Sequence, residues 1–258
     1  YPFQFNAILL PAKVKVHVAG RASGKSFQNG YELYDNIKIM PRGITTITQR
    51  TYGQALTKTL PSTFKLLEKF GLKRYNPKTK TGDYVVCQKP PAGFLTPHEK
   101  ILSYDNAISF INGHAAVLLS QDTNSRGPNA DFNITDEALT LDKEKFDAEV
   151  APTNRGNEDI FGRLSKQPLL KHHGLLFTSS MPYTAEQRWL IEFAKYYEEE
   201  AGIRLFDTWN RIVKLQMQLI EATEQKNSKL FRDIWQETVT IRKKIAPFVS
   251  KDNILFTV

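Results

Sequence analysis

The sequence predicts an α/β fold in which a mainly parallel central sheet is flanked by helices, with a helical hairpin toward the C-terminal end. Strand-like and helix-like runs alternate over about the first 200 residues, the order that builds parallel sheets covered by helices. Beyond that point the pattern is almost purely helical. We therefore expect a core at residues 1–200 and a hairpin subdomain at residues 201–258.

Strands are expected where polar and apolar residues alternate or where β-branched residues gather. Asn112-Gly113 lies between two such runs and is typical of a tight β-hairpin. The expected strands cover residues 13–19, 43–48, 108–111, 115–119, 132–135 and 174–178.

Helices are expected between these strands. The first covers residues 25–37, and the second covers residues 51–70 with an interruption at Pro61. Residues 184–187 (Thr-Ala-Glu-Gln) have the form of a capping box, which predicts a helix that begins there and reaches Glu200.

The expected hairpin begins after Ala201-Gly202, and Asn227-Ser228 supplies its turn and cap. Apolar residues recur three or four positions apart in both helices, which gives each helix one apolar face. We expect these faces to pack on the α/β core. They consist of Phe206, Trp209, Val213, Met217 and Ile220, then Phe231, Ile234, Trp235, Ile241 and Ile245.

Composition narrows the classes of function. The net charge of +8, from 35 basic and 27 acidic residues, favours a polyanionic partner without requiring one. Cys87 is the only cysteine, so an intramolecular disulfide and a cysteine-based zinc site are excluded, a reducing cytosolic compartment fits, and a buried structural role is expected for it. No apolar run approaches the ~20 residues of a membrane span, so no membrane partner is expected.

The strongest motif lies between the first expected strand and the first expected helix. A loop there directs backbone N–H groups and the helix N-terminus at a phosphate, which predicts an ATP-binding P-loop. Lys25 would reach the β- and γ-phosphates, and the Ser26 hydroxyl would hold Mg²⁺. Ala19 stands where the usual pattern has a glycine. The loop is Gly20, Arg21, Ala22, Ser23, Gly24, Lys25 and Ser26.

Two adjacent carboxylates, Asp136 and Glu137, follow the expected strand at residues 132–135. Beside a phosphate loop, Asp136 can hold the Mg²⁺ that bridges the phosphates, and Glu137 can polarise the attacking water. Paired acids are common on protein surfaces, so this pair carries weight only together with the loop. The second carboxylate favours ATP hydrolysis over a GTP switch.

Two further features accompany these acids. Arg126, in Ser-Arg-Gly, precedes the acid strand and could stabilise transition-state charge, although a surface turn explains it at least as well. Thr178, Ser179 and Ser180 end the last expected strand. One of these hydroxyls could lie near the γ-phosphate or the lytic water, and an ordinary polar loop is the alternative.

Other polar clusters are weaker signals. His172-His173 precedes a strand, and because neighbouring residues on a strand face opposite sides, no metal site is expected there. A polar loop at residues 76–82 and its approach are basic, and a solvated surface is the simpler interpretation, with DNA contact as the alternative. Its charged residues are Lys73, Arg74, Lys78 and Lys80.

Taken in order, these motifs resemble the ATPase domain of large terminase subunits, the DNA-packaging motors of tailed phages. An arginine inside the phosphate loop is typical of that family. The resemblance covers roughly residues 13–190. It is carried by Gly20 to Ser26, Gln49-Arg50-Thr51-Tyr52, Ser125-Arg126-Gly127, Asp136-Glu137-Ala138 and Thr178-Ser179-Ser180-Met181-Pro182.

The resemblance implies roles for particular residues. Arg21 would act in cis on the bound phosphates, and Arg126 would reach into the neighbouring subunit's site, with Arg155 as its rival. One hydroxyl from Thr178 to Ser180 would couple hydrolysis to movement, and which of the three does so stays open.

The resemblance also implies an ATP-hydrolysing motor that moves double-stranded DNA into a procapsid, with ATP and Mg²⁺ bound. Implied partners are DNA, a portal protein, a small terminase subunit and further copies of this chain in a ring, in the host-cell cytoplasm at the portal. Family members usually continue into a nuclease domain, for which the hairpin subdomain leaves no room, so we expect ATP hydrolysis without DNA cleavage.

Two other interpretations remain open at this point. One is another P-loop DNA translocase or helicase-like ATPase, although helicases normally carry two motor domains. The other is a nucleotide-binding scaffold that hydrolyses poorly alone, against which Glu137 counts.

Overall fold

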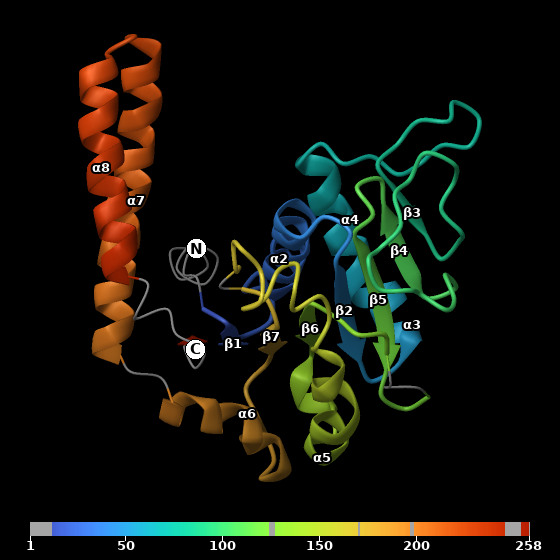
Figure 1. Cartoon of the computed structure of the whole chain (residues 1–258). Helices are drawn as coiled ribbons and strands as arrows, with labels where there is room; N and C mark the ends of the chain where they lie inside the picture. The colour runs from blue at the N-terminus through green and yellow to red at the C-terminus, as the bar shows by residue number, and fades with distance from the viewer. Residues whose placement is uncertain (1–11, 124–126, 170, 197–198, 246–253, 258) are drawn as a thin grey trace.

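The computed structural model describes residues 12–123, 127–169, 171–196, 199–245 and 254–257 (Figure 1). The strands are β1 Val14–Val18, β2 Ile44–Gln49, β3 Tyr84–Val86, β4 Ala107–Phe110, β5 Ala115–Ser120, β6 Phe132–Asp136, β7 Gly174–Ser179 and β8 Ile254–Thr257. The α-helices are α2 Lys25–Ile39, α3 Tyr52–Gln54, α4 Leu60–Lys69, α5 Lys143–Lys145, α6 Trp189–Glu192, α7 Glu199–Glu224 and α8 Ser228–Ile245. Short π-helical segments cover Ala55–Thr59 and Phe146–Val150, and 3₁₀ turns cover Ala138–Thr140, Ala151–Thr153, Glu186–Arg188 and Phe193–Tyr196.

The described strands form one eight-stranded sheet in the order β3-β4-β5-β2-β6-β7-β1-β8. The pairs from β5 to β8 are all parallel, and β4 runs antiparallel to both of its neighbours. The expected α/β class with a mainly parallel sheet is thus confirmed. Since β7 lies between β1 and β6, the carboxyl ends of these three strands meet at one edge of the sheet.

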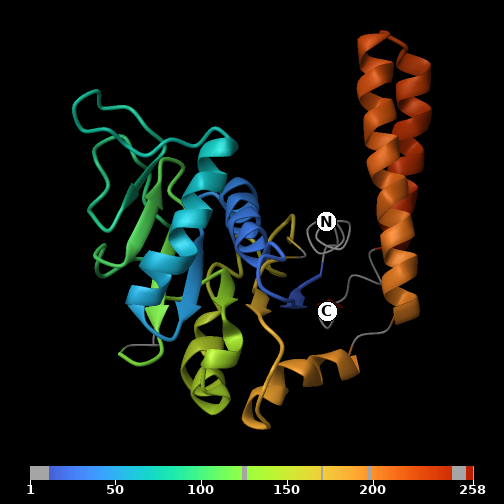
Figure 2. The ribbon, with the colours of Figure 1, turned by 180° about the vertical axis from the view of Figure 1, so that it is seen from behind.

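Helices cover both faces of this sheet, as the alternating pattern predicts. On one face α2 and α4 lie side by side (Figures 1 and 2), and their apolar residues, including Leu33 and Leu67, pack on Ile134 and Leu176 of the sheet. On the other face, the segments after β6 and after β7 pack on β1, β5 and β7. Both faces of the central strands are therefore buried.

The expected helix at residues 51–70 is interrupted, but Pro61 is not the cause. Pro61 lies in the first turn of α4, where the missing N–H costs little. The interruption is the π-helical segment Ala55–Thr59, which joins α3 to α4. This wider turn places Thr59 inside the protein, 1% exposed.

The helix expected from the capping box at residues 184–187 is wrong in its start and its length. Gln187 Oε1 accepts a hydrogen bond from Tyr183 N (2.9 Å), so the cap contact falls one residue before Thr184. Only 3₁₀ turns and the four-residue α6 follow. Trp189 and Leu190 are buried against the sheet, and this packing overrides the local helix signal.

The helical hairpin is present as α7 and α8, but its boundary and packing differ from expectation. Ala201-Gly202 lies inside α7, and in both views the hairpin projects away from the core (Figures 1 and 2). The expected inner face is largely exposed: Met217 is 60% and Ile220 61% exposed.

The two helices instead pack on each other, through an apolar seam that matches the expected face on α8 but not on α7. Leu215, Ala222 and Ile234 form it, with Leu219 and Ile241 alongside. On α8 the expected Ile234 and Ile241 do lie in this seam, whereas on α7 the neighbouring row of apolar residues replaces the expected one. The side chains of Phe206, Trp209 and Ile245 lie outside the described residues.

The last described segment was not expected to be a strand. Ile254–Thr257 forms β8 and pairs in parallel with β1, so the end of the range assigned to the hairpin lies in the core sheet. The hairpin is thus inserted in the chain between β7 and β8. None of the helices in the described part has the length and apolarity that a membrane crossing requires.

Candidate functional site

The predicted phosphate loop connects β1 to α2, as expected. Gly24 has a left-handed backbone (φ +88°) directly before α2, a conformation that favours glycine. Ala22 is also left-handed, at φ +61°. Ala19 has no positive φ, so its position does not demand the glycine that the usual pattern places there.

Lys25 is folded back onto the loop that precedes it. Its Nζ donates to Ala19 O (2.7 Å) and Gly20 O (3.0 Å), and it lies 3.5 Å from Ser180 Oγ. The side chain is nearly buried, with 9% of the residue exposed. This places the ammonium group between the carboxyl ends of β1 and β7, where it can exchange carbonyl partners for an anion.

Asp136 connects four parts of the protein. Its Oδ1 accepts hydrogen bonds from Thr178 Oγ1 (2.9 Å) and from Glu137 N (3.1 Å). Its Oδ2 accepts from Gln49 Nε2 (3.0 Å) and from Thr59 Oγ1. A carboxylate has about four acceptor positions, so a metal ion or metal-bound water must share an oxygen with one of these donors.

Glu137 is directed differently from its neighbour. Its backbone is left-handed (φ +51°, ψ +47°), which costs a non-glycine residue roughly 1–2 kcal/mol. This conformation ends β6 and starts the 3₁₀ turn Ala138–Thr140. As a result Glu137 is exposed and lines a cavity, whereas Asp136 is buried.

The three hydroxyls at the end of β7 contact three different partners. Thr178 Oγ1 accepts from Asn29 Nδ2 of α2 (3.0 Å) and donates to Asp136. Ser179 Oγ accepts from Leu139 N (3.2 Å), in the turn after Glu137. Ser180 Oγ lies beside the Lys25 ammonium. One strand end therefore touches the acid, the turn after it and the phosphate-loop lysine.

These groups surround a cavity of about 310 Å³, which lies in the size range of small-molecule sites. Gln49, Gln54 and Thr140 line it without having been predicted as site residues. Gln49 stands out because its Oε1 is buried and has no hydrogen-bond partner. A polar residue at the carboxyl end of β2 was the available signal. The lining is Arg21, Lys25, Ser26, Gln49, Gln54, Asp136, Glu137, Thr140 and Ser180.

Of the two arginines expected to act in trans, the structure describes Arg155, which does not line this cavity. Arg126 lies outside the described residues. Arg155 is exposed and its Nε donates to Asn129 Oδ1 (2.9 Å), before the start of β6. At ~3.3 Å per residue, that end of β6 is about 13 Å from Asp136, and Asn129 lies three residues further back along the chain. Within one chain Arg155 is therefore remote from the acids.

Of two weaker sequence signals, the basic loop agrees with expectation and the single cysteine does not. The basic residues of the segment 73–80 are exposed, as a solvated loop requires. Cys87 is only partly buried, which corrects the expectation of a buried cysteine, and burial raises the pKa of its thiol.

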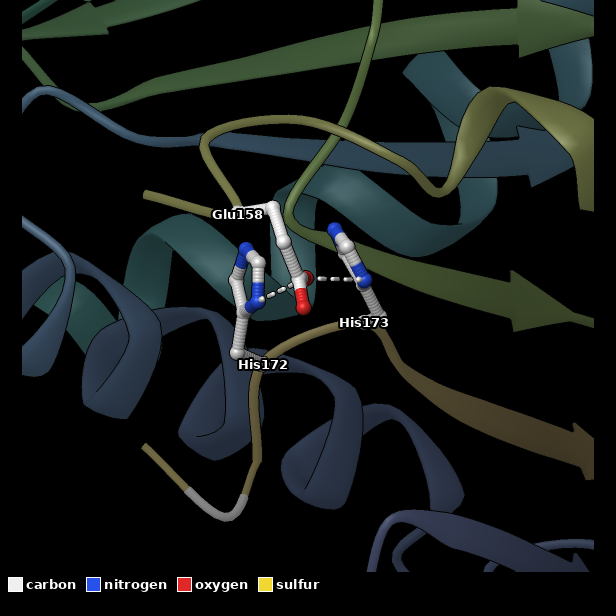
Figure 3. Close-up of side chains that lie close together, drawn as sticks. All are labelled: Glu158, His172 and His173. Atoms are coloured by element: carbon white, nitrogen blue, oxygen red, sulfur yellow. Dashed lines mark ion pairs between the residues drawn. The ribbon is translucent and has the colours of Figure 1, made fainter. Parts of the chain in front are cut away.

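The expectation that His172 and His173 face opposite ways is wrong. His173 precedes β7 and has a left-handed backbone (φ +58°), which interrupts strand alternation. The two rings lie 3.7 Å apart between centroids, and both approach Glu158 (Figure 3).

Comparison with known proteins finds similar solved structures but no similar sequences. No protein-family model and no curated protein sequence matches the chain. Among solved structures, the large terminase ATPase domain of Thermus phage P74-26 is similar at 21% identity and a TM-score of 0.42. An arginine-to-alanine mutant of the same domain is similar at 20% identity and a TM-score of 0.44. Each match covers 72% of this chain and 66% of the solved chain, so this chain spans just under two thirds of that length.

Proposed function

We propose that this chain is an ATPase that binds ATP and Mg²⁺ in the cavity at the carboxyl ends of β1, β6 and β7. The observation that carries the proposal is the convergence of Lys25, Asp136, Glu137 and Ser180 on one cavity of about 310 Å³. Their segments are far apart in the sequence, and the strand order brings them together.

The phosphate-binding part rests on the loop and its lysine. A phosphate at the N-terminus of α2 meets backbone N–H groups and the positive end of the helix dipole. Lys25 Nζ would then exchange its acceptors Ala19 O and Gly20 O for phosphate oxygens. This exchange needs no rearrangement of β1. Arg21 lines the same cavity and is proposed to act in cis on the phosphates.

The metal-binding part rests on two hard oxygen donors, which are the ligands that Mg²⁺ prefers. Ser26, the second residue of α2, lines the cavity, and Asp136 supplies a buried carboxylate. Mg²⁺ bound there would neutralise phosphate charge. Gln49, Thr59 and Thr178 hold the Asp136 carboxylate in place for this task.

Glu137 is proposed as the residue that orients and deprotonates the attacking water. It is the exposed carboxylate of the cavity, and its left-handed backbone keeps it there. Its presence favours hydrolysis over a nucleotide-binding scaffold. The unpartnered Gln49 Oε1 is a second acceptor from which such a water could be held.

We further propose that hydrolysis drives translocation of double-stranded DNA into a procapsid, because the order of motifs resembles large terminases. The proposed partners are a portal protein, a small terminase subunit and other copies of this chain in a ring, with Arg126 acting in trans. A helicase-like translocase shares the same cavity chemistry and remains the second candidate.

Two substitutions test the ATPase. Lys25→Ala should weaken binding of a fluorescent ATP analogue, and Lys38→Ala, an exposed lysine on the same helix, should not. Glu137→Gln should bind the analogue and lose turnover, whereas Glu144→Gln should behave as the unchanged protein. Equal affinity in both lysine variants would refute the phosphate site.

The trans arginine is tested by mixing. An Arg126→Ala protein should bind ATP and turn it over slowly, and adding the Glu137→Gln protein should restore turnover because that protein donates its own Arg126. The expected gain is large, ~10³–10⁵-fold in related enzymes. No rescue in assembled rings would exclude Arg126 and favour Arg155.

A further inference from the structure

We propose that Glu158, His172 and His173 form a second metal site, which binds a transition-metal ion of the Zn²⁺ type and is separate from the nucleotide cavity. The ligand atoms of these residues all lie within 4.8 Å of one another (Figure 3). The site lies at the amino ends of β6 and β7. At ~3.3 Å per residue, Asp131 beside it is about 17 Å from Asp136.

Two left-handed residues create the cluster. Asn157 (φ +42°) directly precedes Glu158, and His173 itself has φ +58°. Such backbone persists in non-glycine residues only where surrounding contacts hold it. His173 N donates to Asp131 O (2.7 Å), which fixes this turn against β6. The strained backbone is what directs two consecutive imidazoles to the same carboxylate.

The distances between the ligand atoms fit a shared ion. Glu158 Oε2 lies 3.3 Å from His173 Nδ1 and 3.7 Å from His172 Nδ1. Around a tetrahedral ion with bonds of ~2.0–2.1 Å, neighbouring ligand atoms are about 3.4 Å apart. The rings are inclined by only 34°, so a bound ion would have to tilt the more exposed His173 away from His172.

The second nitrogen of each ring already has a supporting acceptor. His172 Nε2 lies 3.0 Å from Asp131 Oδ1, and His173 Nε2 lies 2.8 Å from Gly156 O. A carboxylate or carbonyl on the far nitrogen is the usual support of a metal-binding histidine. It places the hydrogen on Nε2 and leaves the Nδ1 lone pair directed at Glu158.

The close contact between His173 Nδ1 and Glu158 Oε2 requires a cation between them. Gly156 O can only accept, so His173 Nε2 must carry the hydrogen, and a neutral His173 then presents Nδ1 as an acceptor. Glu158 Oε2 is also an acceptor, and two acceptors 3.3 Å apart repel. Either a proton or a metal ion must lie between them. Glu158 Oε1 is already used by Arg163 N (3.1 Å), which leaves Oε2 for the ion.

The donor set selects the ion. Two imidazole nitrogens and one carboxylate suit Zn²⁺, Co²⁺ or Ni²⁺, whereas Mg²⁺ prefers oxygen alone. The ion would join the turn at residues 156–158 to the turn at residues 171–173, because Glu158 and the histidines come from those two segments. Its role would be structural: it would stabilise the two turns at the amino ends of β6 and β7.

The test uses the whole chain, free of any histidine tag and stripped of metal by a chelator. Zn²⁺ is titrated against a chromophoric competitor, and Co²⁺ is followed by its visible spectrum. We expect one Zn²⁺ per chain and a higher melting temperature. His173→Gln and Glu158→Gln should each weaken binding at least about tenfold, and Glu158→Gln keeps an oxygen for Arg163 N. The control His98→Gln changes an exposed histidine outside the cluster and should not alter the affinity.

Three results would overturn the proposal. One is no Zn²⁺ bound beyond the level of the Glu158→Gln protein, which would leave a proton as the shared cation. Another is Zn²⁺ that Mg²⁺ with a non-hydrolysable ATP analogue displaces, since that ion would occupy the nucleotide cavity. The third is a cluster variant that folds, as judged by circular dichroism, and keeps the original affinity.

Discussion

Thr178→Val is the substitution that most directly tests the hydrogen-bond network beside the proposed nucleotide cavity. Valine has nearly the shape of threonine, so the packing of β7 is preserved and only the hydroxyl is lost. Thr178 is fully buried, accepts from Asn29 Nδ2 and donates to Asp136 Oδ1. The change therefore removes one donor from a carboxylate and leaves one amide unpaired.

The expected loss of stability follows from these two contacts. A hydrogen bond to a charged group contributes ~1.5–3 kcal/mol, and an unpaired buried donor costs ~1–3 kcal/mol. The added methyl group recovers about 0.8 kcal/mol. We expect the free energy of unfolding to fall by about 3 kcal/mol.

Thr63→Val is the matched control. Thr63 is also buried, but its Oγ1 donates to a neutral acceptor, Thr59 O (3.1 Å), one helical turn away. The loss there should be about 1 kcal/mol or less. Urea unfolding followed by circular dichroism measures both variants, and ATP turnover is measured beside it.

Turnover should separate the variants more sharply than stability. Thr178→Val should bind ATP through the intact phosphate loop but hydrolyse it slowly, because Asp136 loses a fixing donor. Thr178→Ser restores the hydroxyl and should restore the rate. If Thr178→Val and Thr63→Val lose equal stability and both hydrolyse ATP normally, the proposed role of Thr178 is wrong.

Three further changes have expected outcomes. Glu32→Gln should cost about 3–5 kcal/mol in urea unfolding, because it removes the carboxylate from the buried Lys15 (3.1 Å) and leaves Lys171 (2.6 Å) paired with Asp35 alone; a loss under 1 kcal/mol would contradict this. Burial lowers the pKa of His114 to about 4, so its contribution to stability is complete above about pH 6.5 and is lost as pH falls toward 4, by roughly 3 kcal/mol. His114→Gln should flatten that pH dependence, and an unchanged slope would exclude His114 as its source. Gly82→Ala should lower the melting temperature, since its φ is +137° and a Cβ would lie 2.4 Å from Tyr75 Cα; an unchanged melting temperature would show that the loop yields.

The central strands could be predicted from sequence because each carries its signal locally. The expected strand at residues 132–135 differs from β6 by one residue, and Asn112-Gly113 does join two antiparallel strands. In contrast, β8 is only four residues long and depends on pairing with β1, whose residues lie 240 positions earlier in the sequence. No local pattern contains that pairing.

The residues of the candidate site also fall into two groups, those that a local motif predicts and those that only the tertiary structure brings together. The phosphate loop and the two acids follow from short motifs, and the structure does bring them to one cavity. The hydrogen-bond donors that hold Asp136 could not be predicted from such motifs. Thr59 lies near Asp136 because of a π-helical segment, and Gln49 lies near it because of the strand order. Among the three hydroxyls at the end of β7, Thr178 is the one that donates to Asp136, and the sequence alone does not distinguish it from the other two.

Two other differences from expectation have separate causes. Alternation along a strand separates neighbouring side chains, yet His173 takes a left-handed φ and joins His172. In the hairpin, two apolar rows run along α7, and periodicity alone does not say which one meets α8. The row with Leu215 does, and the row with Met217 is exposed.

The return of the chain to β8 changes how this protein should be shortened. A cut after residue 200 would remove the hairpin and also uncover β1, the strand that leads into the phosphate loop. An uncovered β1 would present a row of free backbone donors and acceptors, which invites association with other chains. Replacing α7 and α8 by a flexible linker would keep β8 paired with β1. Nucleotide binding could then be measured without the hairpin and without exposing β1 as a new edge strand.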